Sequence, residues 1–432
     1  MNKKKKLAKK LLTFIENSPT SFHATKNIKN KLESNNFKKL KEDEKWDLNP
    51  GNKYYLERNN SALIAFTYGK NNIENGFNLI GAHTDSPLLK IKNEAVIKKH
   101  NYIKIGTEVY GGPIVHTWLD KELSIAGRVT VEEGGEIKSK LVNFEEPVAI
   151  IPNLAIHMNR KVNKGFEYNK QKHLPAIIST VNNEDDNSNN NKNFLKQLIA
   201  DKINTKYESI YELDLFLYDI TSPKVTGIEN EFVTAGRLDD LAMCHSILEA
   251  LTNKDRYEAT NIGIFYDNEE IGSRTYQGAN SNFLRDTLER LIITEGGDRQ
   301  DYFRAIANSF LISADQAHAL HPNFSDKHDS NYAPVINKGP VVKLNANFRY
   351  ATTSETASYF EKLCKDANVP FQRLANRSDM KSGSTIGPMT SSLLNVKTVD
   401  VGNPLWAMHS VRETGGVKDH FYMTEIFKKF FK

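Results

Sequence analysis

Short apolar runs that end in polar or charged side chains recur along this chain. Each has the length of a strand buried in a sheet. These runs cover residues 61–69, 77–83, 262–266, 310–318 and 341–345. Segments near 281–309 and 354–367 have apolar residues at helical spacing and follow such runs in the chain. This alternation of strands and helices predicts an α/β fold.

The pattern changes between about residues 90 and 234. Short β-rich segments separated by glycine turns, such as the turn at 132–136, replace the alternation there, which is typical of an all-β module. We therefore expect a discontinuous α/β domain of residues 1–89 and 235–432, with residues 90–234 inserted as a β-rich domain. Within the insertion, the polar, Asn-rich stretch 182–194 predicts a flexible loop.

The first 60 residues predict two amphipathic helices, the first of which follows a lysine run at positions 3–6. Its apolar residues have helical spacing: Leu7, Leu11, Leu12 and Ile15. With a net charge of +5, the lysine run is interpreted as a solvated helix end, and contact with RNA or anionic lipid is the alternative. We therefore expect neither nucleic acid nor membrane as a partner.

The cellular compartment is indicated by cysteine content and by apolar segments. Two cysteines, Cys244 and Cys364, in 432 residues argue against a disulfide framework and for a reducing environment. No apolar segment approaches the roughly 20 residues that span a bilayer, and the amino terminus lacks the apolar region of a signal peptide. We expect a cytoplasmic protein.

Three carboxylates follow the run at 262–266: Asp267, Glu269 and Glu270. Acidic side chains at the end of a buried strand lie at the carboxyl edge of an open sheet, where α/β proteins place their chemistry. Neighbouring side chains point apart, so one glutamate can bind a metal while the other faces a substrate water. The simpler interpretation, a solvated acidic turn, would be preferred if this pair stood alone.

Similar side chains follow the other apolar runs or begin a helix: His83, Asp85, Asp239, Asp240, Asp315 and His409. Imidazole and carboxylate oxygen are ligands of zinc, and two metals that share a carboxylate need about five of them. In the His-x-Asp spacing, the carboxylate can accept the second imidazole N–H. Individually, His83 could be an ordinary polar residue and Asp239 a helix cap. Their joint placement at strand ends favours a metal site.

Other common catalytic patterns are absent from the chain. We find no phosphate-binding glycine motif and no G-x-S-x-G nucleophile turn. Cys244 has apolar neighbours at helical spacing, which favours a role in the core over one as a nucleophile.

Ordered sequence blocks over nearly the whole chain resemble the M18 family of metallo-aminopeptidases, the aspartyl aminopeptidase group. The blocks include GAHTDSPLLKIK at 81–92, IPNLAIHMNRKVNKGFEYNKQ at 151–171, AGRLDDLAMC at 235–244, FYDNEEIGS at 265–273, SADQAHALHPN at 313–323 and LWAMHSVRE at 405–413. The resemblance implies a two-metal, zinc-peptidase-like α/β catalytic domain with an inserted β-rich dimerisation domain. It also implies Zn²⁺ as cofactor, two per subunit, with Mn²⁺ or Co²⁺ as substitutes.

The resemblance also implies roles for individual residues. Asp239 would bridge the two metals, with His83 and Asp315 at one and Glu270 and His409 at the other. Glu269 would be the general base, and Asp85 would support His83. The family commonly has Asn after the bridging Asp, whereas this chain has Asp240, which adds a carboxylate near the cluster.

Two further residues gain implied roles in substrate binding. His157, within the insertion, would reach the active site of a neighbouring subunit; a role as metal ligand is the alternative. Lys343 matches a basic position that aspartyl-selective members use to hold an acidic side chain, and the alternative is an ordinary exposed lysine. The family's assembly implies dimers that form a dodecamer.

The function expected from these observations is removal of the amino-terminal residue of peptides, with preference for Asp or Glu. The alternatives are an aminopeptidase of neutral or broad specificity and a related two-metal deacylase or carboxypeptidase. A non-catalytic protein that kept the fold would not need Glu269 beside a full ligand set.

Overall fold

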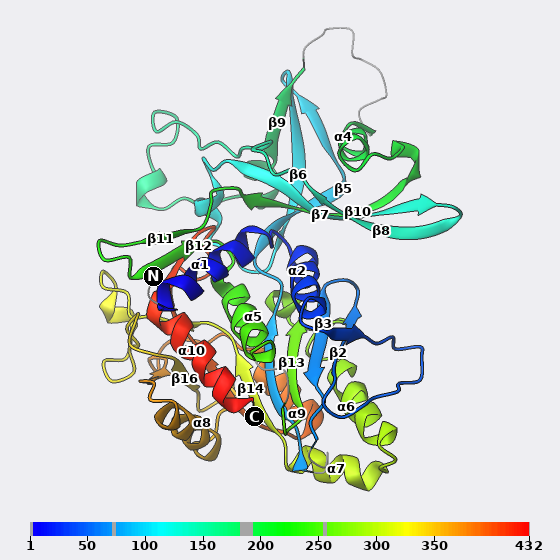
Figure 1. Cartoon of the computed structure of the whole chain (residues 1–432). Coiled ribbons are helices and arrows are strands. Elements are labelled where there is room, and N and C mark those ends of the chain that lie inside the picture. The colour runs from blue at the N-terminus through cyan, green and yellow to red at the C-terminus, as the bar shows by residue number, and fades with distance from the viewer. Residues whose placement is uncertain (1–2, 71–74, 182–192, 254–256, 432) are drawn as a thin grey trace. The chain divides into compact units, whose positions relative to one another are not determined.

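The computed structural model describes residues 3–70, 75–181, 193–253 and 257–431, so residues 182–192 of the predicted loop lie outside the described part. The chain forms two compact units, each made of more than one stretch of the sequence (Figure 1). The first comprises Met1–Asp85, Pro223–Met408 and Glu413–Lys432, and the second Ser86–Ser222 and His409–Arg412.

The unit boundaries fall at 85/86 and 222/223, not at the expected 89/90 and 234/235. Residues 224–235 belong with the first unit because their strands pair, directly or through each other, with strand 413–416 of that unit. The role of the second unit in dimerisation stays a prediction.

A nine-stranded sheet forms the centre of the first unit, in the order β1-β2-β3-β13-β4-β14-β18-β16-β17. The central strands β13, β4, β14 and β18 are parallel to their neighbours within this group, so their carboxyl ends share one edge. The strands are β1 Phe37–Lys39, β2 Lys53–Arg58, β3 Ala62–Thr67, β4 Asn78–His83, β13 Asn261–Tyr266, β14 Phe310–Ala314, β16 Val341–Leu344, β17 Gln372–Ala375 and β18 Lys397–Gly402. The first 60 residues therefore hold strands β1 and β2 besides the two expected helices.

Alternate residues of the central strands enter two separate apolar cores, because successive side chains of a strand point to opposite faces. On β4, Ile80 and Ala82 join one core, and Leu79 joins the other. The sheet is thus covered by helices on both faces. The helices of this unit are α1 Lys3–Glu16, α2 Ser21–Glu33, α5 Leu238–Leu251, α6 Phe283–Thr294, α7 Arg299–Ala307, α8 Ser354–Asp366, α9 Ile386–Leu394 and α10 Val417–Phe430.

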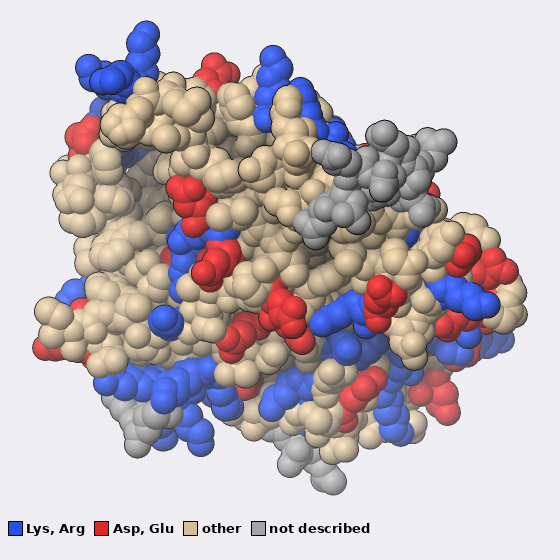
Figure 2. Space-filling model, turned by 90° about the horizontal axis from the view of Figure 1, so that it is seen from above, with Lys and Arg blue, Asp and Glu red and all other residues tan. Residues whose placement is uncertain are grey.

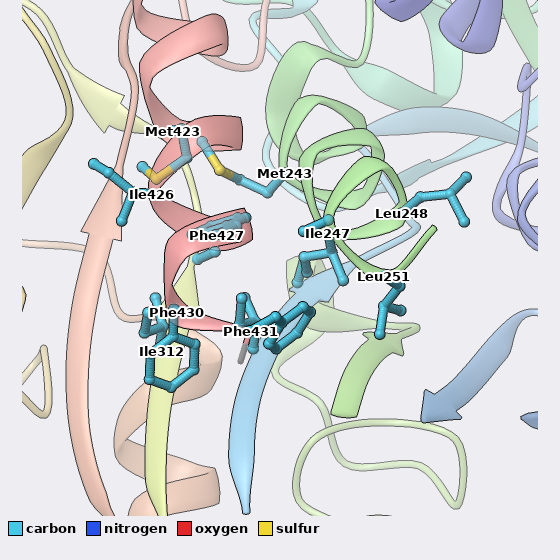
Figure 3. Close-up of a cluster of buried hydrophobic side chains, with 14 of the residues drawn as sticks. Met243, Ile247, Leu248, Leu251, Ile312, Met423, Ile426, Phe427, Phe430 and Phe431 are labelled. Carbon is cyan, nitrogen blue, oxygen red and sulfur yellow. The ribbon is translucent and has the colours of Figure 1, made fainter. Parts of the chain in front are cut away.

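Helices α5 and α10 lie side by side on one face of this sheet. Figure 3 shows Met243 and Ile247 of α5 facing Met423 and Phe427 of α10, with Ile312 of β14 below them. Cys244 is fully buried in the same core, which confirms the expected packing role. Both cysteines are free. The Cys244 thiol also donates to the carbonyl oxygen of His83 at 3.0 Å, so α5 is joined to the end of β4.

The lysine run belongs to helix α1, whose predicted apolar face is buried. Lys10 pairs with Glu249 at 3.1 Å. Figure 2 shows basic side chains mixed with acidic ones over the face that it draws. Among the described residues, no helix combines the length and apolar character that crossing a membrane requires.

A smaller sheet of the first unit has the order β11-β12-β20-β19-β15. Two of its strands follow strands of the large sheet in the chain: β15 comes after β14, and β19 comes after β18. Strand β20 begins at Glu413. Its strands are β11 Lys224–Thr226, β12 Phe232–Ala235, β15 Ala317–His318, β19 Pro404–Trp406 and β20 Glu413–Gly416.

The second unit is built on a six-stranded sheet in the order β8-β7-β10-β5-β6-β9, and each paired neighbour is antiparallel. This agrees with the β-rich texture expected for the insertion. Its strands and helices are β5 Leu88–Lys99, β6 Tyr102–Tyr110, β7 Leu123–Glu133, β8 Glu136–Asn143, β9 Ala176–Thr180, β10 Ile210–Asp219, α3 Lys170–His173 and α4 Phe194–Ile203.

Candidate metal centre

His83 is the last residue of β4 and its side chain is buried. The Nδ1 atom lies 3.0 Å from the backbone carbonyl oxygen of Asp85. Because a carbonyl only accepts, Nδ1 carries the proton of this hydrogen bond, which leaves Nε2 for a metal. Nε2 lies 3.5 Å from Asp239 Oδ1 and 3.9 Å from Asp315 Oδ1. The expected Asp85 carboxylate is also near Nδ1, at 3.4 Å.

Asp239 and Asp240 lie in the first turn of α5, where their backbone angles are not helical and the peptide bond between them is cis. The N-cap residue is Arg237, so Asp239 is not the cap that its position suggested. The Asp239 backbone N–H donates to the Glu413 carboxylate at 3.0 Å. Both aspartates are buried.

The Asp240 carboxylate is held by donors from two separate segments, the end of β4 and the residues between β14 and β15. Its Oδ2 accepts the backbone N–H of His83 at 3.3 Å, and its Oδ1 accepts Gln316 Nε2 at 3.3 Å. Asp240 therefore ties the end of β4 to the segment that follows β14, in agreement with a carboxylate added near the cluster.

Glu269 and Glu270 lie in the 3-10 turn Glu269–Ile271 after β13. Their backbone N–H groups donate to the two oxygens of Asp85, at 3.1 and 3.2 Å. The preceding Asn268 has a positive φ of 62°, and its side-chain oxygen accepts hydrogen bonds from Thr275 and Gln277. These hydrogen bonds hold the acidic turn in place at the end of β13.

Two groups of side chains offer ligand atoms within 4.8 Å of one another: His83, Asp239 and Glu270, and Asp239, Asp240 and Asp315. Asp239 belongs to both. In the part of the chain that the structure describes, no other group of three His, Cys, Asp or Glu side chains meets this criterion. Several carboxylates and one imidazole in a largely buried space leave negative charge that a divalent cation would neutralise. The residues present therefore fit a metal of the zinc type.

Burial and neighbouring charges shift the pKa values of the clustered side chains. Burial raises the pKa of the Glu269 carboxyl to about 8, and Asp315 and Asp85 add to this rise while His83 opposes it. Burial also raises the pKa of Asp240. Burial alone would lower the pKa of His83, but hydrogen bonds to Asp239, Asp315 and Asp85 raise it well above its ordinary value. A bound cation would favour the ionised carboxylates instead.

Lys343 on β16 is only 3% exposed, so the ordinary exposed lysine proposed as its alternative role is wrong. Its Nζ lies 3.2 Å from Asp315 Oδ2 and 5.5 Å from the centre of the Tyr350 ring. Although burial lowers the pKa of Lys343, Asp315 and Tyr350 raise it above its ordinary value. Lys343 therefore carries its charge beside one of the predicted metal ligands.

His409 and His157 belong to the second unit, so their positions relative to the cluster stay predictions. The Nδ1 atom of His409 lies 3.1 Å from the backbone carbonyl oxygen of Gly112. As in His83, this contact assigns the proton to Nδ1, so Nε2 is the nitrogen that would bind a metal if the predicted role is right. His157 is exposed.

Glu413 and Gln316 contact the cluster residues, yet neither was predicted from the sequence. Glu413 holds the backbone of Asp239, and Gln316 holds Asp240. Glu413 begins β20, Gln316 follows β14, and both lie within sequence blocks already quoted. Their place in these blocks was the only available signal.

Comparisons with known proteins agree with this geometry. The family described as "Aminopeptidase I zinc metalloprotease (M18)" matches residues 14–431. A protein named probable M18 family aminopeptidase 2, from Clostridium novyi (strain NT), is 48% identical over 435 residues, covering 100% of each chain. In the solved complex of Ape4 and Nbr1, a chain with 37% identity and a TM-score of 0.94 matches 99% of this chain and 86% of its own.

A solved structure of the S. cerevisiae mApe1 dodecamer is 30% identical, with a TM-score of 0.85, over 98% of this chain and 95% of that one. The expected α/β fold with a second, β-rich domain is confirmed by these likenesses and by the sheets described above. This chain belongs to the M18 family of zinc metallopeptidases and is an aminopeptidase of that family.

Proposed function

We propose that this aminopeptidase uses two metal ions, with Asp239 as the ligand common to both. The observation that supports this most directly is the membership of Asp239 in both groups of clustered ligand atoms. Along with Asp239, His83 and Asp315 would hold one cation, and Glu270 and His409 the other. The clustered groups pair His83 with Glu270 and Asp315 with Asp240, so the division of ligands between the two ions is part of the proposal.

Two zinc ions, when bound, lower the pKa of a water molecule and polarise the peptide carbonyl. Glu269 takes the proton of that water and later delivers it to the leaving amine. The hydrogen bond from the Glu269 backbone N–H to Asp85 holds the turn that presents this carboxylate. Burial and neighbouring carboxylates raise the pKa of Glu269 to about 8, and bound cations would lower it into the range in which the base is ionised.

The substrate would be a peptide with a free amino terminus and an acidic first residue. Lys343 supports the acidic preference because it is a buried ammonium group next to Asp315, and Asp315 and Tyr350 raise its pKa. A specific observation favours the second candidate, an aminopeptidase of neutral or broad specificity: the Lys343 charge is already paired with Asp315. A substrate carboxylate would have to share this ammonium with Asp315.

The assembly we propose is a dimer that builds a dodecamer, in which His157 completes the substrate pocket of a partner subunit. The dodecamer of the similar mApe1 chain supports the assembly. Exposed apolar side chains flank His157 in the sequence: Leu154 is 52% exposed, Ile156 46% and Met158 75%. Such a patch favours contact with another protein surface. A cytoplasmic location is proposed on the free cysteines.

A peptide panel with defined metals tests the activity itself. Zinc-loaded protein should release the first residue from peptides with a free amino terminus and leave amino-acetylated versions of the same peptides intact. Release of the carboxy-terminal residue, or cleavage of acylated amino acids alone, would instead support the rival carboxypeptidase or deacylase function. Comparison of Asp, Glu, Leu and Ala at the first position then measures the acidic preference.

A further inference from the structure

Arg237, the residue before α5, has a backbone conformation that is uncommon for any residue except glycine. Its φ of 59° and ψ of 26° lie in the left-handed region. In a residue that carries a Cβ atom this conformation costs free energy, and it persists only where surrounding contacts hold it. Arg237 stands two positions before Asp239. The contacts that hold Arg237 therefore also set the direction in which the chain enters the turn of Asp239.

The guanidinium group of Arg237 reaches the end of helix α1. Its Nε donates to the carbonyl oxygen of Ser18 at 3.1 Å, and its Nη2 donates to the carbonyl oxygen of Ile15 at 3.3 Å. Carbonyl groups at the end of a helix carry partial negative charge, which a cation stabilises. Helix α1 has no basic residue in its own last turn. Arg237 supplies that cation from 219 positions beyond Ser18.

Apolar packing joins the same two segments. Leu238, between Arg237 and Asp239, is 2% exposed and shares a core cluster with Leu11 and Ile15 of α1. The backbone angles of Asp239 itself are not helical, so the regular hydrogen bonds of a helix do not fix its place. Helix α1 thus contacts both residues that lead the chain into this position.

Helix α2 in turn holds the carbonyl groups that Arg237 uses. The side-chain amide of Asn27 donates to the carbonyl oxygen of Asn17 at 2.6 Å and to the hydroxyl oxygen of Ser18 at 3.0 Å. Asn27 therefore fixes the turn between α1 and α2. Hydrogen bonds and chain connectivity lead from Asn27 through this turn to Arg237 and on to Asp239.

We propose that Arg237 is a positioning residue for Asp239 and that the turn between α1 and α2 is its support. While the guanidinium group is anchored, residue 237 keeps its left-handed conformation, and the Asp239 carboxylate stays 3.5 Å from His83 Nε2. Without the anchor, the backbone relaxes toward a commoner conformation and carries Asp239 out of place. This inference rests on the proposed role of Asp239 as the shared metal ligand. It assigns Arg237 no contact with metal or substrate.

The test measures zinc dissociation constants by chelator competition on full-length wild type, Arg237→Ala, Asn27→Ala and the double variant. Arg237→Ala should weaken zinc binding about 10- to 100-fold, as loss of residues supporting metal ligands commonly does. Asn27→Ala should weaken it about 3- to 10-fold, because it removes neutral hydrogen bonds that support the anchor. In the Arg237→Ala background, Asn27→Ala should change the constant less than about twofold, because the anchor is already gone. Wild-type affinity in either single variant, or an equal factor for Asn27→Ala in both backgrounds, overturns the proposal.

Arg237→Gly separates the anchor from the backbone conformation. Glycine adopts a positive φ at no steric cost, but it offers nothing to hold the residue there. Arg237→Gly should therefore lose zinc affinity as Arg237→Ala does. Wild-type affinity in Arg237→Gly would show that the conformation needs no anchor, and would overturn the proposal.

Ser309, before β14, provides a control for general destabilisation. It is buried, and its hydroxyl oxygen accepts the backbone N–H of Phe77 at 2.8 Å. Ser309→Ala should leave zinc affinity unchanged even if it lowers the unfolding temperature. An equal loss of zinc affinity in Ser309→Ala and Arg237→Ala would mean that destabilisation explains the result, and would overturn the proposal.

If Arg237→Ala does not fold, Asn27→Ala decides alone, against Asn30→Ala at an exposed asparagine of the same helix. Asn27→Ala should weaken zinc binding and Asn30→Ala should not, and equal affinities overturn the proposal. Failure of the underlying metal assignment would appear separately. In that case the wild-type chain itself would bind no zinc, or Asp239→Ala would bind it normally.

Discussion

The carboxylate of Asp85 accepts a hydrogen bond from the backbone N–H of Glu269 at 3.1 Å. This contact joins the end of β4 to the turn after β13, across 184 positions of sequence. The second carboxylate oxygen of Asp85 accepts the backbone N–H of Glu270. Asp85 therefore positions both the predicted base and a predicted ligand, besides lying beside His83.

Replacing Asp85 by Asn should weaken zinc binding or kcat by about 10- to 100-fold. The amide nitrogen of Asn would face a backbone N–H, so one of the two hydrogen bonds to the acidic turn would be lost. Zinc titration and steady-state kinetics measure both effects. Asp47→Asn, at an exposed aspartate, serves as control, and equal behaviour of the two variants would show that Asp85 does not hold the turn.

Lys343→Ala should lower kcat/KM for Asp and Glu substrates far more than for Leu or Ala substrates. A partly desolvated charge pair contributes about 2–3 kcal/mol of binding free energy, or roughly 30- to 150-fold. The measurement is kcat/KM on four matched substrates, with the exposed Lys338→Ala as control. A uniform loss on all substrates would assign Lys343 to the support of Asp315 instead of substrate selection.

The stability of the metal-free protein should depend on a buried histidine pair. His245 Nδ1 lies 3.0 Å from His420 Nε2, and one nitrogen must donate while the other accepts, so the accepting ring is neutral. Burial lowers the pKa of His245 to about 3 and that of His420 well below its ordinary value. In the unfolded chain the two histidines bind protons near pH 6.5, whereas in the folded chain they stay neutral. The stability that the histidine pair contributes is therefore present above that pH and is lost as the pH falls below it.

Between about pH 6.5 and 4, each neutral histidine should reduce the free energy of unfolding by about 1.4 kcal/mol per pH unit. His420→Asn removes one of the two groups, so its urea-unfolding free energy should decline less steeply with falling pH than that of the wild type. The carboxylates of the metal centre contribute equally to both proteins. Identical slopes would show that His420 is protonated in the folded state.

The proposed assembly can be tested by mixing two inactive variants, His157→Ala and Glu269→Gln. After subunit exchange, a mixed dimer would hold one site with both residues intact, so activity should return. The particle should have the mass of twelve subunits of 49.0 kDa each. Confirmed exchange without activity would place His157 within its own subunit's site or outside any site, and an active monomer would contradict the assembly.

The sequence predicted those strands that a short stretch of neighbouring residues is enough to identify. The apolar runs that became β4, β13 and β14 were recognisable because polar ligand-type residues follow them directly, as in His83 after β4. The shared edge of parallel strands then explains why these residues meet. The short strands β1 and β2 were missed because they lie among polar residues and gain their stability from pairing within the sheet.

Other features depend on contacts that no local pattern carries. The backbone of Asp239 is held by Glu413, which is 174 positions away. Lys343 is buried because β16 pairs on both sides, with β17 and β18, so its strand lies inside the sheet. Such burial follows from strand order, which periodicity does not determine.

The most direct test of the account measures kcat and zinc content together in Glu269→Gln. The substitution keeps the size of the side chain but removes its ability to accept the proton of the attacking water. We predict unchanged zinc content and a kcat lower by roughly two to four orders of magnitude, while the exposed control Glu258→Gln keeps wild-type kcat. A zinc-loaded Glu269→Gln variant that cleaves aminoacyl substrates near the wild-type rate would contradict the account.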